Sequence, residues 1–108
     1  MYYTQFGVER DNKKAFELMQ KAAKVGYPPA QLKLADFYHN GWYVEKDLKE
    51  AFDLYYKAAL KEYDEAMYEV GHRYHKGIGV EQDLNKAIEW YKKSNYYMAE
   101  WALKDISG

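Results

Sequence analysis

The chain has 108 residues, with sixteen Lys and Arg against seventeen Asp and Glu, and no cysteine. This length suits one domain rather than two. Because the charges are balanced and spread along the chain, we expect no basic surface for nucleic acid or anionic lipid. The lack of cysteine excludes disulfides and thiolate metal sites. No apolar run is long enough for a membrane span or a secretory signal, so we expect a cytoplasmic protein.

Tyrosine is unusually frequent, with thirteen copies, and much of this excess comes from an internal repeat. An offset of 36 residues aligns the sequence with itself at 24 of 72 positions, against roughly five for this composition by chance. The matches keep their order through three copies, of which the first and last are incomplete. Tyr38, Tyr55, Tyr74 and Tyr91 hold repeated positions, so we predict that they fill the core.

The first predicted element is a helix over 12–25, in which apolar residues recur at the spacing of one helical face. Asp11 precedes this stripe and is a predicted N-cap. Residues 1–11 are similar to a loop whose preceding helix is absent, so Tyr2, Tyr3 and Phe6 are candidates to cover the open end of the helix. If that end stays uncapped, its apolar surface favours self-association, which is an alternative structural role for the chain.

Two kinds of helix then alternate. One kind follows Pro28-Pro29 and Asp64-Glu65, which suit a first helical turn. The other kind follows Asp47 and Asp83, which are placed to accept hydrogen bonds from free N–H groups at a helix start. The sequence therefore predicts two antiparallel helices in each repeat unit.

Glycine-containing turns at 41–44 and 77–80 separate the two helices of a unit, because glycine tolerates a positive φ. Tyr43 stands where the other copy has Gly79, so we expect that turn to be reshaped or strained. The turn at 77–80 lacks the preceding strand and the Lys-Ser/Thr pair of a phosphate-binding loop. We therefore interpret it as a helix–helix turn.

The stretch from Ala66 to Lys93 contains Gly-x-Gly-Val-x2-Asp followed by Lys-Ala-x2-Trp-Tyr, and the stretch from Ala30 to Ala59 matches the same pattern. This pattern closely resembles the Sel-1-like repeat, a relative of the tetratricopeptide repeat. The resemblance implies an all-α fold, a right-handed superhelical solenoid of antiparallel helix pairs with about six helices. We divide the chain into a partial unit at 1–29, units at 30–65 and 66–95, and a capping helix at 96–106.

The resemblance also implies a protein–protein interaction module, an adaptor or scaffold whose concave face is lined by the first helix of each pair. Helical phase places a set of residues on that face, opposite the core stripe. Aromatic and apolar anchors among polar groups are typical of binding hot spots. The predicted partner-binding residues are Leu32, Asp36, His39, Asn40, Tyr68, His72, His75, Lys76 and Trp101.

The same residues are compatible with other functions. The three histidines, His39, His72 and His75, fall on one predicted face and could reach a metal ion or small molecule, although no further ligands accompany them. No serine or threonine stands near a recognisable base and no carboxylate pair lies in an apolar setting, so we predict no enzyme and no cofactor. The remaining alternative is that these residues only cover a solvated face.

Overall fold

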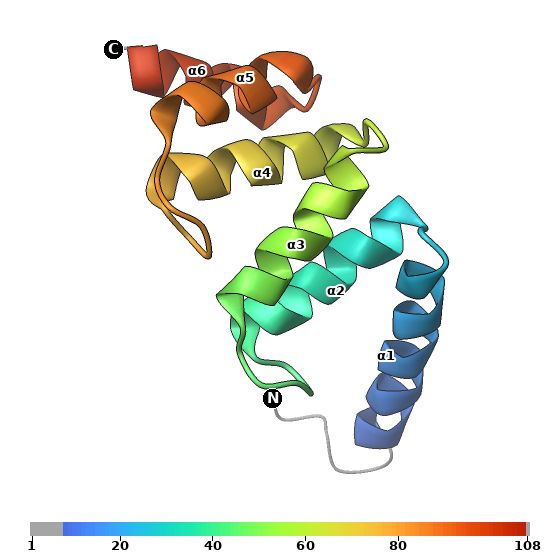
Figure 1. Cartoon of the computed structure of the whole chain (residues 1–108). Coiled ribbons are helices and arrows are strands. Elements are labelled where there is room, and N and C mark those ends of the chain that lie inside the picture. The colour runs from blue at the N-terminus through green and yellow to red at the C-terminus, as the bar shows by residue number, and fades with distance from the viewer. Residues whose placement is uncertain (1–7, 108) are drawn as a thin grey trace.

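The computed structural model describes residues 8–107 and the side chains of 13–106, and within this range it contains six α-helices and no strand. Each helix packs mainly on its neighbours in the chain, and α1 and α6 lie at opposite ends of an elongated array of 49 × 28 × 24 Å (Figure 1). The predicted all-α helical repeat fold is confirmed. The helices are α1 (Val8–Lys24), α2 (Pro28–Asn40), α3 (Leu48–Ala59), α4 (Asp64–Lys76), α5 (Leu84–Lys93) and α6 (Tyr97–Ser107).

The helix starts after Asp47 and Asp83 follow the predicted capping. The Asp47 carboxylate accepts a hydrogen bond from the Glu50 N–H at 3.0 Å, and Asp83 accepts one from the Lys86 N–H at 3.1 Å. Pro28 and the residue after it form the first turn of α2. These contacts satisfy N–H groups that a helix leaves free at its start.

The predicted N-cap at Asp11 is wrong, because α1 begins at Val8 and Asp11 lies inside the helix. At the equivalent position in the later copies, the loop is bonded to the helix before it. The backbone N–H of Asp47 donates to the Tyr38 carbonyl, and that of Asp83 donates to the Tyr74 carbonyl. These bonds, each 2.9 Å, hold the loop extended. The loop sequence of the first copy instead forms the beginning of α1. The predicted cover by the aromatic residues before α1 lies outside the described residues.

Two repeated tyrosines fill the core, as predicted. Tyr55 and Tyr91 are each 1% exposed and pack among buried alanines. A Cβ on Gly71 would lie 2.7 Å from the Tyr91 ring, so this mid-helix glycine makes room for the ring. Tyr38 and Tyr74 are half-buried and pack against the same core.

The start of α6 is fixed by Ser94, which stands where the preceding copy has Ala58. Its hydroxyl donates to the Asp64 carbonyl at 2.7 Å and accepts a hydrogen bond from the Tyr96 N–H at 3.0 Å. The Asn95 N–H donates to the Asp64 carboxylate at 3.2 Å. The last helix is thereby tied to the beginning of α4, and this attachment sets the position of the α6 side chains beside that helix.

Candidate partner-binding surface

A hollow of about 340 Å³ lies between α4, α5 and α6. We call it the α4–α6 hollow. Five of the nine predicted binding residues line it, from both α4 and α6. The full lining consists of Tyr68, His72, His75, Lys76, Tyr91, Met98, Trp101, Ala102 and Asp105. The helical phase of unit 66–95 and of the capping helix therefore places its predicted residues around one hollow.

The hollow has an aromatic wall around Tyr68. The Tyr68 ring lies 5.7 Å from Tyr91, 5.9 Å from His72 and 5.4 Å from Tyr96, measured between ring centroids. These spacings are in the range of favourable aromatic pairs, which hold the rings in place. Trp101 stands at the rim and is 72% exposed. The rings around Tyr68 are thus fixed by their contacts with one another, while the exposed Trp101 side chain beside them is free to contact another molecule.

Two histidines bring polar groups to the hollow. His75 Nδ1 and the Tyr91 hydroxyl are joined by a hydrogen bond of 3.2 Å, and burial raises the pKa of Tyr91, so the phenol keeps its proton. Burial lowers the pKa of His72, and the nearby Arg73 guanidinium adds to this effect. The His72 imidazole is therefore neutral at pH 7 and has one donor and one acceptor.

Asp36 and His39 lie away from this hollow, in a polar network between α2 and α4. Asp36 accepts a hydrogen bond from the Tyr55 hydroxyl. Arg73, only 5% exposed, donates to Glu69 at 2.5 Å and to the Tyr55 hydroxyl at 3.2 Å, and its Nη2 lies 3.4 Å from His39 Nδ1. Burial lowers the pKa of His39, as does the Arg73 charge. This network links α2 and α4, which carry all of the predicted residues except Trp101.

Sequence reasoning missed Arg73 and Glu69, although a signal for them existed. Arg73 stands where the preceding copy has Phe37, and Glu69 stands where it has Lys33. Both positions therefore depart from the repeat, and together they form one buried ion pair. When two residues four apart both differ from the repeat and carry opposite charges, they are expected to interact on one face of the helix.

Leu32 and Asn40, like Asp36 and His39, do not line the hollow. Leu32 was expected on the exposed face, but it is 7% exposed and belongs to the core. The reason is that α2 packs against α1 on one side and α3 on the other, so its buried face is wider than the predicted stripe. Asn40 is exposed at the end of α2, and its side-chain amide donates to the Asp36 carbonyl at 2.9 Å.

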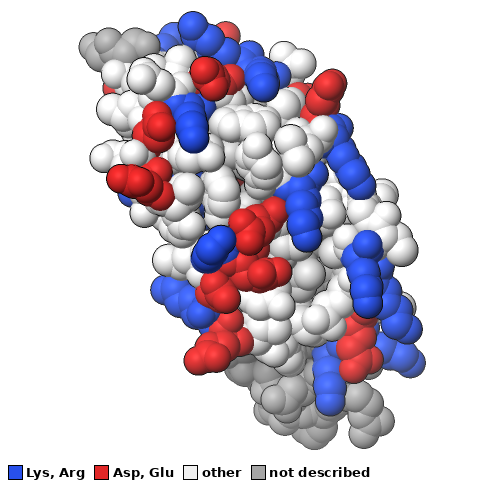
Figure 2. Space-filling view, viewed as in Figure 1, with Lys and Arg blue, Asp and Glu red and all other residues white. Residues whose placement is uncertain are grey.

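The described residues contain no group of three or more His, Cys, Asp or Glu side chains that could hold a metal ion. The metal alternative at the histidines thus gains no support from their placement. No helix within residues 8–107 combines the length and apolar character needed to cross a membrane. The face shown in Figure 2 carries acidic and basic side chains side by side.

Six helices that pack in chain order around a repeated core define a stacked helical repeat protein. The family model of the Sel1 repeat matches residues 1–27, 28–63 and 64–101. The chain belongs to the Sel1 repeat family, whose members are generally protein–protein interaction modules.

Solved structures with this fold include a Sel1 repeat protein from Oxalobacter formigenes, with 36% identity and a TM-score of 0.84 over 96% of this chain and 80% of that one. Cysteine rich protein B of Helicobacter pylori has 28% identity and a TM-score of 0.80, over 85% of this chain and 71% of its own. A protective antigen of uropathogenic Escherichia coli with this fold has 37% identity and a TM-score of 0.78, over 82% of this chain but only 20% of its own. No curated protein sequence matches the chain significantly.

Proposed function

We propose that this protein is an adaptor that binds a segment of a partner protein along α4 and α6, with the α4–α6 hollow as the anchor pocket. The observation that carries this proposal is Trp101, 72% exposed at the rim of a hollow whose wall is aromatic. Tryptophan and tyrosine are enriched among residues that dominate binding energy at interfaces. Such an anchor gains most of its contact area only when a partner covers it.

The lining indicates how the partner is recognised. A hollow of about 340 Å³ is at the small end of the range for ligand sites, which suits one large apolar or aromatic side chain rather than a cofactor. The neutral His72 imidazole, the Lys76 ammonium and the Asp105 carboxylate lie around it. These groups supply hydrogen-bond donors and acceptors for the partner's backbone on either side of the anchor.

The partner segment extends along the array toward α2 in this proposal. Asp36, His39 and Asn40 are the predicted residues on that helix, and their side chains are exposed or half-buried. Because Asp36 and His39 already contact Tyr55 and Arg73, they contribute less to a new contact than a free side chain does. We therefore assign the larger share of the binding energy to the α4–α6 hollow.

A displayed library of random peptides tests this function when selected against the full chain and then counter-screened against variants. Trp101→Ala removes the exposed anchor, and Leu60→Ala is the matched control because Leu60 is also apolar and 61% exposed but lies outside the hollow. We expect the selected peptides to lose at least about tenfold in affinity for Trp101→Ala, since truncation of an aromatic hot spot costs about 2 kcal/mol or more. Leu60→Ala should bind as the unmodified protein does. Equal binding to both variants, with both folded, contradicts the assignment.

A further inference from the structure

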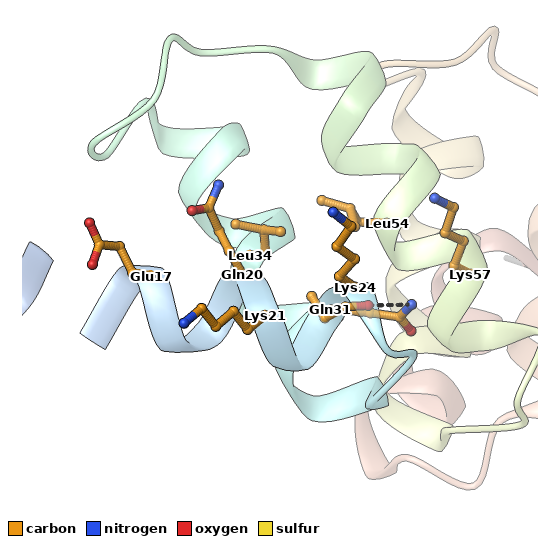
Figure 3. Close-up of a pocket in the computed structure, with 9 residues that line it drawn as sticks. Glu17, Gln20, Lys21, Lys24, Gln31, Leu34, Leu54 and Lys57 are labelled. Carbon is orange, nitrogen blue, oxygen red and sulfur yellow. Dashed lines mark hydrogen bonds between the residues drawn. The ribbon is translucent and has the colours of Figure 1, made fainter. Parts of the chain in front are cut away.

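A second and larger hollow, of about 580 Å³, lies between α1 and α3 (Figure 3). We call it the α1–α3 hollow. It shares no lining residue with the α4–α6 hollow. Its lining has three ammonium groups, one carboxylate, two amides and an apolar part, namely Glu17, Gln20, Lys21, Ala23, Lys24, Gln31, Leu34, Leu54 and Lys57.

None of the three lysines of this hollow forms an ion pair with a side chain of residues 13–106. Among the side chains of residues 13–106, ion pairs within 4 Å join Lys49 to Asp53 and Arg73 to Glu69, and none involves Lys21, Lys24 or Lys57. In Figure 3, Lys24 from α1 and Lys57 from α3 extend to the same side of the ribbon. Like charges around one hollow repel each other, so an anion placed there is attracted by all of them.

The same hollow contains a buried amide with an unused acceptor. Gln31 is 4% exposed. Its Nε2 donates to the Ala23 carbonyl at 3.4 Å, and its Oε1 is buried and accepts no hydrogen bond from the described residues. A buried acceptor without a donor destabilises the folded state, so its presence calls for a cause. A ligand that brings an N–H group into the hollow supplies the missing donor.

The next repeat shows that the fold does not require these polar residues. The equivalent space between α3 and α5 is lined by Leu60 and Met67, at the positions of Lys24 and Gln31. There the Trp90 ring packs edge-on against Tyr56 at 5.7 Å, and Lys93 lies 4.7 Å from the Trp90 centroid. Lys24 and Gln31 are therefore features of this site and not of the repeat, whereas Lys57 has its counterpart in Lys93.

We propose that the α1–α3 hollow binds an acidic peptide segment of a second partner protein. The lysine ammonium groups bind the carboxylates of the segment. A backbone N–H of the segment donates to Gln31 Oε1, and the aliphatic part of its side chains packs on Leu34 and Leu54. An adaptor with both surfaces holds two partners at once, one at each hollow.

Fluorescence anisotropy of a labelled pentaglutamate peptide at low ionic strength tests this site on the full chain. The variants Lys24→Leu and Gln31→Met introduce the residues that the next repeat already has, so the fold accommodates them. We expect each to weaken binding about tenfold, because each removes a charge-assisted or buried hydrogen bond. Lys93→Leu, in the equivalent apolar space, is the control and should leave the affinity unchanged.

The thermal stability of the variants shows whether weaker peptide binding results from the loss of a contact or from damage to the fold. Gln31→Met removes a buried unpaired acceptor, so we expect this variant to have a higher Tm while it binds the peptide less tightly. Undetectable binding of pentaglutamate, or equal weakening by Lys93→Leu, overturns the proposal. Unchanged affinity in Gln31→Met overturns the role of the amide. Displacement of the peptide by free glutarate at equal carboxylate concentration overturns the assignment to a peptide.

Discussion

Tyr43 and Gly79 occupy the same position one repeat apart and share a left-handed backbone conformation, with φ of 62° and 76°. A Cβ on Gly79 would lie 2.2 Å from the Leu48 carbonyl oxygen, so space as well as φ requires glycine there. At the Tyr43 turn the ring instead packs 5.9 Å from Phe16 and 6.2 Å from Phe37. The strained turn expected from the sequence is present, and aromatic contacts offset its cost.

Substitution of Tyr43 separates backbone strain from ring packing. Tyr43→Ala loses the ring contacts and keeps the strained φ, whereas Tyr43→Gly loses the same contacts and relieves the strain. A left-handed conformation costs a residue with a Cβ about 1 kcal/mol or more, and the entropy that glycine adds to the unfolded chain offsets part of this. We therefore expect the glycine variant to be the more stable of the two by about 0.5 kcal/mol. Urea denaturation measures the difference. An alanine variant as stable as the glycine variant contradicts this account of the turn.

Glu62 is the second non-glycine residue with positive φ, at 62°, and it is the repeat equivalent of Gly26, at 93°. Glu62 is exposed. Glu62→Gly should therefore raise the free energy of unfolding by about 0.5 kcal/mol, because relief of strain exceeds the entropy that glycine adds to the unfolded chain. The control is Leu60→Gly, at a position with an ordinary φ of −65°, where we expect a loss of stability in the same thermal melts. A loss in both variants would contradict the strain at Glu62.

Arg73 neutralises a partly buried carboxylate, and its removal tests the polar network. Burial raises the pKa of Glu69, while the Arg73 charge opposes this shift. Arg73→Met leaves Glu69 and the Tyr55 hydroxyl without their cation, so we expect a loss of about 3 kcal/mol. The double variant with Glu69→Gln should recover part of that loss. A double-mutant cycle in urea measures the coupling, and strictly additive losses contradict an interaction between the two side chains.

The lowered pKa of His72 predicts a pH dependence of stability. Its folded-state pKa lies below its unfolded value, since burial disfavours the charged imidazole. Below pH 6.5 the unfolded chain therefore binds more protons than the folded chain, and stability falls as the pH decreases. The free energy of unfolding should decrease less in His72→Gln than in the unmodified protein between about pH 7 and pH 5.

His39 has a pKa shift of the same direction, and the raised pKa of Glu69 acts in the opposite direction. Both groups are present in the two proteins, so to first order their contributions cancel in the difference. Identical pH profiles for the unmodified protein and His72→Gln contradict burial of the imidazole.

Local sequence signals predicted the helices and turns because the interactions involved are local. Asp47 and Asp83 cap helices through N–H groups three residues away, and Gly41 and Gly77 end helices with a positive φ. The repeat itself then fixed the order of the elements. The start of α1 was mispredicted, because the extended loop at Asp47 and Asp83 depends on hydrogen bonds to distant backbone carbonyls, which the local sequence around Asp11 does not reveal.

The binding surface was predicted less completely, because the exposure of a residue depends on which neighbouring helices cover its side of the helix. Leu32 is covered by its neighbours in a way that the phase of one helix does not reveal. Tyr91 was predicted as a core residue, and it is one, but its hydroxyl also reaches His75 beside the α4–α6 hollow. The α1–α3 hollow was not predicted, since its residues come from three helices and differ from those of the next repeat.

The central claim is that a partner segment binds along α4 and α6, and NMR mapping tests it most directly. A peptide selected against the full chain is titrated into isotope-labelled protein while backbone amide shifts and the Trp101 indole signal are followed. We predict that the largest changes fall on Trp101, on α4 near Tyr68 and His72, and on the first turns of α6. Changes that concentrate elsewhere, with the Trp101 indole signal unmoved, would contradict the claim.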